Sequence, residues 1–282
     1  MSVITFVNNL DEETGKTKSL VAIATNMAIE YNNRILIIST TNKEDKIRNC
    51  YFGEKETRKN MLGIFGASKN TIDTENGIEG IAKISRSNKL TPEIITNYTR
   101  VVFKDRLEVI FGTEKKESYG DLQEKEIMEE YIDLINVANM YYDKVFVDLD
   151  DNIDKDIRDQ ILNISDLVIV NTSQNYSSLK KLKEEKEMLK SLRTLILIGR
   201  YDKFSKYNTK NITRFLEEKN QVLTIPYNTL YFEAMNEAGV PDLFLSLRKS
   251  IDSEDKNAIF IEEVKRASEN IVYRLQELQA RL

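Results

Sequence analysis

The sequence predicts an α/β fold: a doubly wound, mainly parallel sheet with helices on both faces, followed by a long C-terminal helix. Two observations carry this prediction. Short, nearly continuous apolar runs rich in β-branched residues are typical of parallel strands that are covered on both faces. These runs alternate with amphipathic segments of helical period, and the repetition of strand, helix and strand indicates βαβ units.

Seven apolar runs predict the buried strands. In chain order they are residues 3–7, 34–39, 106–112, 143–150, 166–171, 194–199 and 221–226. The long helices are predicted at residues 16–31, 124–142 and 175–192, where apolar residues recur with helical period. The polar, glycine-punctuated stretch from Phe52 to Gly77 predicts a surface loop. We therefore expect residues 1–250 to form one α/β domain.

Residues 251–282 differ, because from Asp255 the chain predicts one long helix. Its seam residues step alternately by three and four, as in a heptad repeat. They are Ile261, Val264, Ser268, Ile271, Leu275, Leu278 and Leu282. This helix packs either on the domain or on a partner chain. Three heptads are the lower limit for a coiled coil, which favours packing on the domain.

The composition of the chain excludes several kinds of functional site. The chain has 282 residues and a net charge of −5, so it can bury a sizeable core, and its acidic balance argues against nonspecific nucleic-acid binding. The lack of histidine excludes Ser-His-Asp chemistry and His-containing metal sites. Cys50 is the single cysteine, which rules out an internal disulfide and is typical of a reducing, cytoplasmic protein. The sequence shows neither a secretory signal nor an integral membrane segment.

The segment NNLDEETGKTKS, which begins at Asn8, lies between the first predicted strand and the first predicted helix. A phosphate-binding loop has this position and the pattern G-x-x-x-x-G-K-[ST]. Gly15, Lys16 and Thr17 match its end, but Leu10 occupies the place of its first glycine. The match is therefore partial.

The retained residues suit a nucleotide, because backbone N–H groups at a helix N-terminus favour an anion. Lys16 would reach the β- and γ-phosphates, and the Thr17 hydroxyl would hold Mg²⁺. The candidate nucleotide-binding residues are Thr14, Gly15, Lys16, Thr17 and Lys18. The expected cofactor is ATP or ADP with Mg²⁺, or none if the loop is kept only as a scaffold.

Five segments, in order, resemble those of the deviant-Walker ATPases, the ParA/MinD superfamily of P-loop proteins that position plasmids, cell-division proteins and secretion machinery. TGKTKSLVAIATNMAIEYNNRILIIST resembles the opening loop, helix and strand, and YDKVFVDLDD resembles the Walker B strand. ISDLVIVNTSQNYSSL, LIGRYDKFSK and TIPYNTLYFEAMNEAGVP resemble three later segments. The similarity spans residues 1–245. Within the superfamily, the chain resembles most the TadZ/CpaE-like branch, which localises pili and secretion systems.

The resemblance places Asp148 on the Walker B aspartate, so the candidate metal residues are Thr17 and Asp148. Other functional positions are changed. The signature lysine falls on Asp11, the loop glycines on Glu12 and Glu13, two aspartates after the second strand on Ser39 and Thr41, and the adenine-contacting asparagine on Gly199. A basic group supplied in trans can be worth about 10³–10⁵ in rate. We therefore expect feeble or absent ATP hydrolysis and predict no catalytic residue.

An acidic stretch, DLDDNIDKDIRD, begins at Asp148. It lacks the spacing and the glycine of a calcium loop. The favoured interpretation is a helix N-terminus whose acids complement the helix dipole.

Three functions compete. The first is a degenerate positioning, regulatory or scaffold protein that binds a secretion, pilus or conjugation apparatus. The second is a working ATPase switch that dimerises with ATP. The third is a small-molecule enzyme of the same fold, such as a dethiobiotin-synthetase-like ligase. Asp11 and the changes at Ser39 and Thr41 favour the first over the second, and a homodimer and protein partners are what the resemblance implies.

Overall fold

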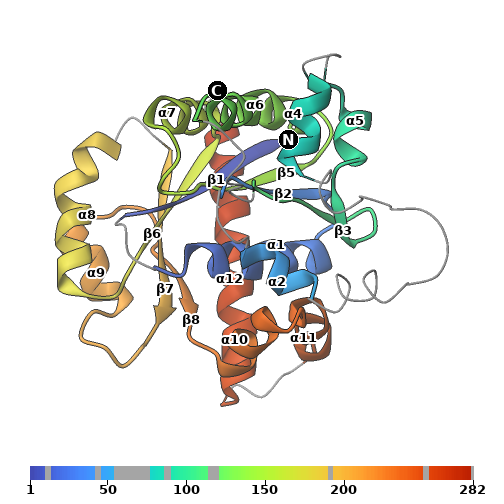
Figure 1. The fold of residues 1–282 in the computed structure, drawn as a ribbon. Helices are drawn as coiled ribbons and strands as arrows, with labels where there is room; N and C mark the ends of the chain where they lie inside the picture. The colour runs from blue at the N-terminus through green and yellow to red at the C-terminus, as the bar shows by residue number, and fades with distance from the viewer. Residues whose placement is uncertain are drawn as a thin grey trace.

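The computed structural model describes residues 1–9, 14–41, 46–53, 77–85, 90–113, 121–189, 193–249 and 254–280. Its centre is an eight-stranded sheet of order β3-β4-β2-β5-β1-β6-β7-β8 (Figure 1). The strands are β1 (Ser2–Asn8), β2 (Ile35–Ser39), β3 (Arg100–Phe103), β4 (Leu107–Ile110), β5 (Lys144–Asp148), β6 (Leu167–Thr172), β7 (Thr194–Tyr201) and β8 (Leu223–Pro226). All neighbours run parallel except β3 and β4.

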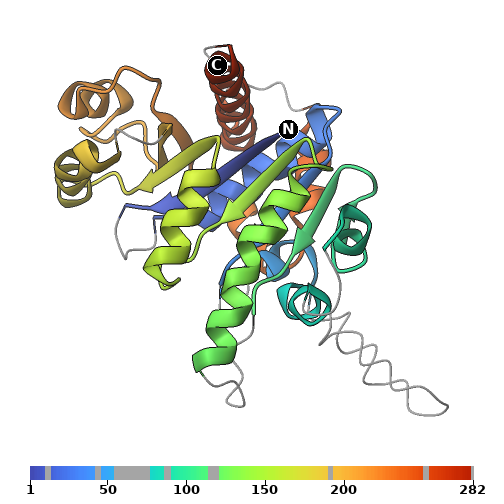
Figure 2. The same ribbon diagram turned by 90° about the horizontal axis from the view of Figure 1, so that it is seen from above.

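Helices cover both faces of the sheet. On one face lie α1 (Lys16–Glu30), α2 (Lys46–Tyr51), α10 (Thr229–Asn236), α11 (Val240–Leu247) and α12 (Lys256–Gln279). On the other lie α4 (Ile78–Ser85), α5 (Pro92–Thr96), α6 (Asp121–Ala138), α7 (Lys155–Ile164), α8 (Tyr176–Leu189) and α9 (Thr209–Leu216). In Figure 1, α4, α6 and α7 lie above the sheet, and α1, α2, α10 and α11 lie below it. Figure 2 views the molecule from the side that α6 and α7 cover.

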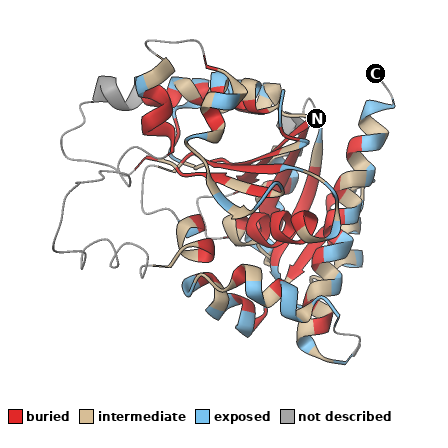
Figure 3. Ribbon diagram, turned by 90° about the vertical axis from the view of Figure 1, so that its right-hand side faces the viewer, coloured by how far each residue is buried: buried red, intermediate tan, exposed pale blue. Residues whose placement is uncertain are grey.

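The central strands are apolar throughout because successive side chains enter opposite cores. Ile4 and Phe6 pack with α1 and α12, whereas Val3 and Val7 pack with the helices of the other face. A strand covered on both faces must bury both sets of side chains. Figure 3 shows the strands and the inward sides of the helices in the colour of buried residues.

The predicted fold class is confirmed. Each of the seven predicted strands is present, and the three predicted long helices correspond to α1, α6 and α8. The eighth strand, β3, was not predicted, because RVVF is short and only half-buried. It forms a hairpin with β4, and Asp105 in the turn has a φ of 59°. Of the predicted loop from Phe52 to Gly77, residues 54–76 lie outside the described residues.

The long C-terminal helix is α12, and the Asp255 carboxylate caps it by accepting from the backbone N–H groups of Asn257 and Ala258. The helix packs against α1, α11 and β8. Four of the seam residues, Val264, Ser268, Ile271 and Leu275, are buried there. Ile261 and Leu278 are half-buried against the same core, and Leu282 lies outside the described residues. The seam is therefore covered by the rest of the chain.

Across the residues for which the structure gives positions, no helix is long and apolar enough to cross a membrane.

Candidate functional site

The phosphate-loop segment lies where the parallel strands end. It connects β1 to α1, and Gly15 is the residue that precedes the helix. Gly15 has a φ of 84°, which L side chains rarely adopt, so this position needs glycine. Leu10, Asp11, Glu12 and Glu13 lie outside the described residues. The expectations for the acidic part of the loop are therefore predictions only.

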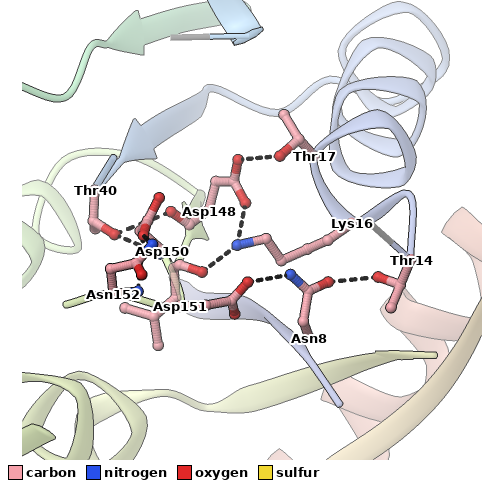
Figure 4. Close-up of polar contacts among 10 residues, drawn as sticks. Asn8, Thr14, Lys16, Thr17, Thr40, Asp148, Asp150, Asp151 and Asn152 are labelled. Atoms are coloured by element: carbon pink, nitrogen blue, oxygen red, sulfur yellow. Dashed lines mark hydrogen bonds and ion pairs between the residues drawn. The ribbon is translucent and has the colours of Figure 1, made fainter. Parts of the chain in front are cut away.

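Lys16, Thr17 and Asp148 come together at this end of the sheet (Figure 4). The Lys16 ammonium lies 3.0 Å from Asp148 Oδ1, and the two side chains are only 8% and 9% exposed. The Thr17 hydroxyl donates to Asp148 Oδ2 at 2.7 Å. Lys16 also donates to the backbone carbonyl of Leu149. One buried carboxylate therefore holds both the lysine and the threonine of the loop.

The sheet register explains this meeting. Asp148 is the last residue of β5, and its neighbours across the ladders are Phe6 on β1 and Ser39 on β2. Asn8 therefore ends β1 close to the point where β5 ends. Since α1 starts from the end of β1, its first turn lies beside Asp148.

A second set of contacts, which the sequence did not predict, ties the loop to the strand ends. The Thr14 hydroxyl donates to Asn8 Oδ1, and Asn8 Nδ2 donates to Asp151 Oδ2. Figure 4 shows this path running beside Lys16. The predicted residue Thr14 therefore holds the loop, through Asn8, to the segment that follows β5.

Asp150 is a further carboxylate at this site. Partial burial would raise its pKa, but hydrogen bonds from the backbone and side chain of Asn152 and from Thr41, together with the positive charge of Lys16, lower the pKa overall. Its backbone N–H donates to the Thr40 hydroxyl at 2.8 Å. Asp150 therefore adds negative charge close to Lys16.

The described residues could help to hold an Mg²⁺ ion that a nucleotide carries, but they do not form a metal site by themselves. They hold no group of three or more His, Cys, Asp or Glu side chains arranged for a metal. Mg²⁺ with a nucleotide needs only one or two protein ligands, because phosphates and waters complete its shell. Thr17 and Asp148 supply that number, and Asp148 Oδ1 accepts no hydrogen bond despite its burial. Its ion pair with Lys16 is the interaction that a metal would have to replace.

Gly199 is the position at which the resemblance expects an adenine-contacting asparagine. A Cβ placed there would lie 2.3 Å from the Thr14 carbonyl oxygen. No side chain fits unless the loop moves, because backbone atoms cannot give way as a flexible side chain can. The backbone of the loop thus occupies the space in front of this part of β7.

A cavity of about 250 Å³ opens beside the loop, between α1, the ends of β7 and β8, and α10. Its lining includes Gly15, Lys18, Arg200, Asn228, Tyr231 and Phe232. The Lys18 ammonium lies 4.5 Å from the centre of the Phe232 ring, and the Tyr231 hydroxyl donates to the Lys18 carbonyl at 2.7 Å. The volume of the cavity is slightly below that of common small-molecule pockets.

One prediction made outside the loop is confirmed. The acidic stretch after β5 leads into α7, whose N-cap Asp154 accepts from the backbone N–H groups of Asp156 and Ile157. Cys50 is a buried residue, 3% exposed, in the core beside α1.

No protein-family model matches the chain, and no curated protein matches it. Solved structures do. A ParA family ATPase of Chlorobium tepidum is 17% identical, with a TM-score of 0.65 over 94% of this chain and 97% of that one. A putative plasmid partition protein of Borrelia burgdorferi, bound to AMPPNP, is 17% identical, with a TM-score of 0.62 over 97% and 99%. The septum site-determining protein MinD of Pyrococcus horikoshii, complexed with Mg-ADP, is 14% identical, with a TM-score of 0.64 over 96% and 95%.

The chain has the fold of these three proteins along almost its whole length. Identities this low establish the fold alone.

Proposed function

We propose that this chain is a degenerate ParA/MinD-like P-loop protein that acts as a positioning, regulatory or scaffold factor, with weak ATP hydrolysis or none. The observation that carries the proposal is the buried contact of Lys16 and Thr17 with Asp148 at the N-terminus of α1. The side chains that would hold a phosphate and Mg²⁺ are present, but in this structure they bind one another. We therefore expect that the chain can bind a nucleotide and hydrolyses it weakly or not at all.

Binding is supported by the retained residues. Gly15 begins α1, whose N-terminal N–H groups attract phosphate, and Lys16 and Thr17 follow at once. The cavity beside Gly15 and Lys18 offers the Phe232 and Tyr231 rings to a base. When bound, Mg²⁺ would neutralise phosphate charge, with Thr17 and Asp148 as the protein groups that hold it.

Weak hydrolysis is supported by what surrounds those residues. Phosphoryl transfer depends almost wholly on positioning and on charge stabilisation. Ser39 is buried where the family has an aspartate, and Thr41 stands at the second such position. The loop carries Asp11 where the family has its trans-acting lysine. Two unit charges about 4 Å apart near a surface interact by about 4 kcal/mol, so added acids oppose a triphosphate.

A nucleotide that enters the site would also have to break the contacts that Lys16 makes in this structure. Lys16 must leave Asp148 and the Leu149 carbonyl to reach a phosphate. An ion pair this deeply buried is lost only if the new partner replaces its charge interactions. We infer that ATP binds weakly.

The biological role follows from the resemblance. A TadZ/CpaE-like protein would act in the cytoplasm, as a homodimer or through protein partners of a secretion, pilus or conjugation apparatus. The related fold of Aquifex aeolicus MinD occurs in a complex with MinC, which supports a role carried out through protein partners. The balanced charges along the outer side of α12 favour protein contacts over anionic lipid.

The test is calorimetric titration of Mg·ATP into the purified protein and into Lys16→Ala, with circular dichroism to confirm that the variant is folded. Lys180→Ala is the matched control, because it removes an exposed lysine whose ion pair among the described residues is with Glu184 on α8. We expect a Kd weaker than about 10 μM, which corresponds to about −6.8 kcal/mol. Lys16→Ala should abolish this binding and Lys180→Ala should preserve it.

Phosphate release measured on the same samples separates the proposal from its alternative, an active ATPase switch. The alternative rests on the retention of the residue types Lys16, Thr17 and Asp148 at their positions in the resemblance. Turnover near 1 s⁻¹, within the usual range of enzymes, would establish the switch and overturn the proposal. Binding without turnover would support a nucleotide sensor, and absence of binding would make the loop a scaffold.

A further inference from the structure

β8 is a terminal strand of the sheet, since its only strand neighbour within the described sheet is β7. The outer edge of a terminal strand presents N–H and C=O groups that a further strand can pair with. Figures 1 and 2 show α9 on one side of β8 and α12 on the other. Both helices are therefore placed to border anything that adds to this edge.

A groove of about 670 Å³ follows that edge. Four consecutive residues, 221–224, lead along its floor into β8, and residues of α9 and α12 form its two sides. This groove is separate from the cavity beside the phosphate loop, with which it shares no lining residue. We refer to it as the β8 groove.

The β8 groove is basic, although the chain as a whole has a net charge of −5. Lys203, Lys210, Lys219 and Arg266 line it. Glu263 is the one acidic residue among the described residues that line it. Within the described part of the chain, Lys210 and Lys219 make no ion pair, so their charges are open to a partner.

The Glu263 carboxylate shows which groups of the groove can bind a carboxylate. Glu263 lies on α12 and accepts two hydrogen bonds, one from the Thr224 hydroxyl on β8 at 2.6 Å and one from Arg266 at 2.8 Å. Thr224 is 6% exposed, so this contact lies at the floor of the groove. The chain's own carboxylate thus occupies a position beside the terminal strand.

We propose that the β8 groove binds an extended, acidic segment of a partner protein, which pairs with β8 as an additional strand. Backbone pairing supplies affinity in strand addition, and side-chain contacts supply selectivity. An acidic segment matches the four cations, and one of its carboxylates would replace Glu263 at Thr224 and Arg266. The inference deepens the proposed function and rests on it only for the expectation that the chain works through protein partners.

A peptide suits this surface better than duplex DNA. The groove runs along a terminal strand between two helices, so an extended peptide can offer backbone N–H and C=O groups to that strand, which a duplex cannot. The net acidic charge of the chain opposes a polyanion at longer range. DNA is therefore the competing outcome of the test.

The probe is a fluorescein-labelled heptapeptide, Thr-Glu-Val-Glu-Val-Glu-Thr, titrated with nucleotide-free protein and followed by fluorescence anisotropy. We expect binding that weakens with salt, a much weaker signal for the Thr-Lys-Val-Lys-Val-Lys-Thr peptide, and loss of binding when alternate amides of the acidic peptide are N-methylated. Hydrogen exchange measured by mass spectrometry should slow at the amides of residues 222–225 by about tenfold.

Lys210→Gln combined with Lys219→Gln should weaken binding by about threefold to tenfold, the expected effect of two exposed charges. The matched control is Lys155→Gln with Lys265→Gln, two exposed lysines outside the groove, and it should bind as the wild type does. No binding of the acidic peptide at 1 mM protein, equal binding of its N-methylated form, or tighter binding of a 20-base-pair duplex would overturn the proposal. Because nucleotide is absent, these outcomes are independent of the Mg·ATP titration.

Discussion

The carbonyl oxygen of Thr14 lies against Gly199, at a point 2.3 Å from where a Cβ on residue 199 would be. The contact joins the phosphate loop to the end of β7. Residue 199 therefore cannot accept the asparagine that the resemblance expects unless the loop backbone moves.

Gly199→Ala should lower the free energy of unfolding by about 1–3 kcal/mol, the usual cost of overpacking. The reason is that the added methyl group would force the loop backbone away from β7. Urea unfolding followed by circular dichroism measures the change. Gly239→Ala is the control, because its Cβ would meet Ala234 at an ordinary 3.5 Å. Equal stability of Gly199→Ala and the wild type would show that the loop yields freely.

The ion pair of Lys16 and Asp148 predicts a non-additive pair of substitutions. Lys16→Met alone should cost about 3 kcal/mol, because it leaves a buried carboxylate without its cation. Adding Asp148→Asn should recover part of that loss, since the remaining charge is removed. A double-mutant cycle in urea measures the coupling. Strict additivity of the two single changes would contradict the contact.

Asp150 predicts a pH dependence of stability. Its pKa is lowered in the folded protein, so folding favours the carboxylate. The stabilisation is present above the unfolded pKa of about 3.9 and is lost as the pH falls through the lower folded value. Asp150→Asn should therefore be less stable by about 1 kcal/mol at pH 7, and the difference should shrink below about pH 4.

Denaturant unfolding of Asp150→Asn and the wild type at pH 7, 5, 4 and 3 measures this difference. Glu233→Gln, which changes an exposed carboxylate on α10, provides the baseline. A stability difference that stays constant with pH would refute the assignment.

The burial of α12 predicts that its seam contributes to the stability of each chain. Ile271 is fully buried, so Ile271→Ala should cost about 2–5 kcal/mol. Tyr273, two residues further on, is 67% exposed, and Tyr273→Ala should change stability by less than about 0.5 kcal/mol. Thermal unfolding compares the two, and light scattering reports the mass in solution. A lowered mass for Ile271→Ala without lowered stability would instead place this seam between chains.

The sequence was sufficient to predict the strands that lie inside the sheet. Ile4 and Phe6 enter one core and Val3 and Val7 the other, so the apolar character of β1 is continuous and easily recognised. β3 gave no such signal, because Val101 on this edge strand is exposed and its run is only four residues long.

The site was predicted in part for a related reason. Local patterns could identify Lys16 and Thr17, and the resemblance could identify Asp148. The contacts of Asn8 with Thr14 and Asp151 depend on how β1 and β5 are aligned, which no local pattern records. The same holds for the β8 groove, whose sides come from helices about 50 residues apart in the chain.

The position of β1 between β5 and β6 has a consequence for protein synthesis. Ser2 pairs with Lys144 and Ile4 pairs with Leu167, so neither neighbour of β1 exists when the strand leaves the ribosome. At translation rates of about 5–20 residues per second, β1 would wait about 7–30 s for β5. During that time an apolar strand remains without a partner and is open to aggregation. The strand that carries the phosphate loop is thus made first, and a nascent chain of this protein would need a chaperone most before residue 148 is reached.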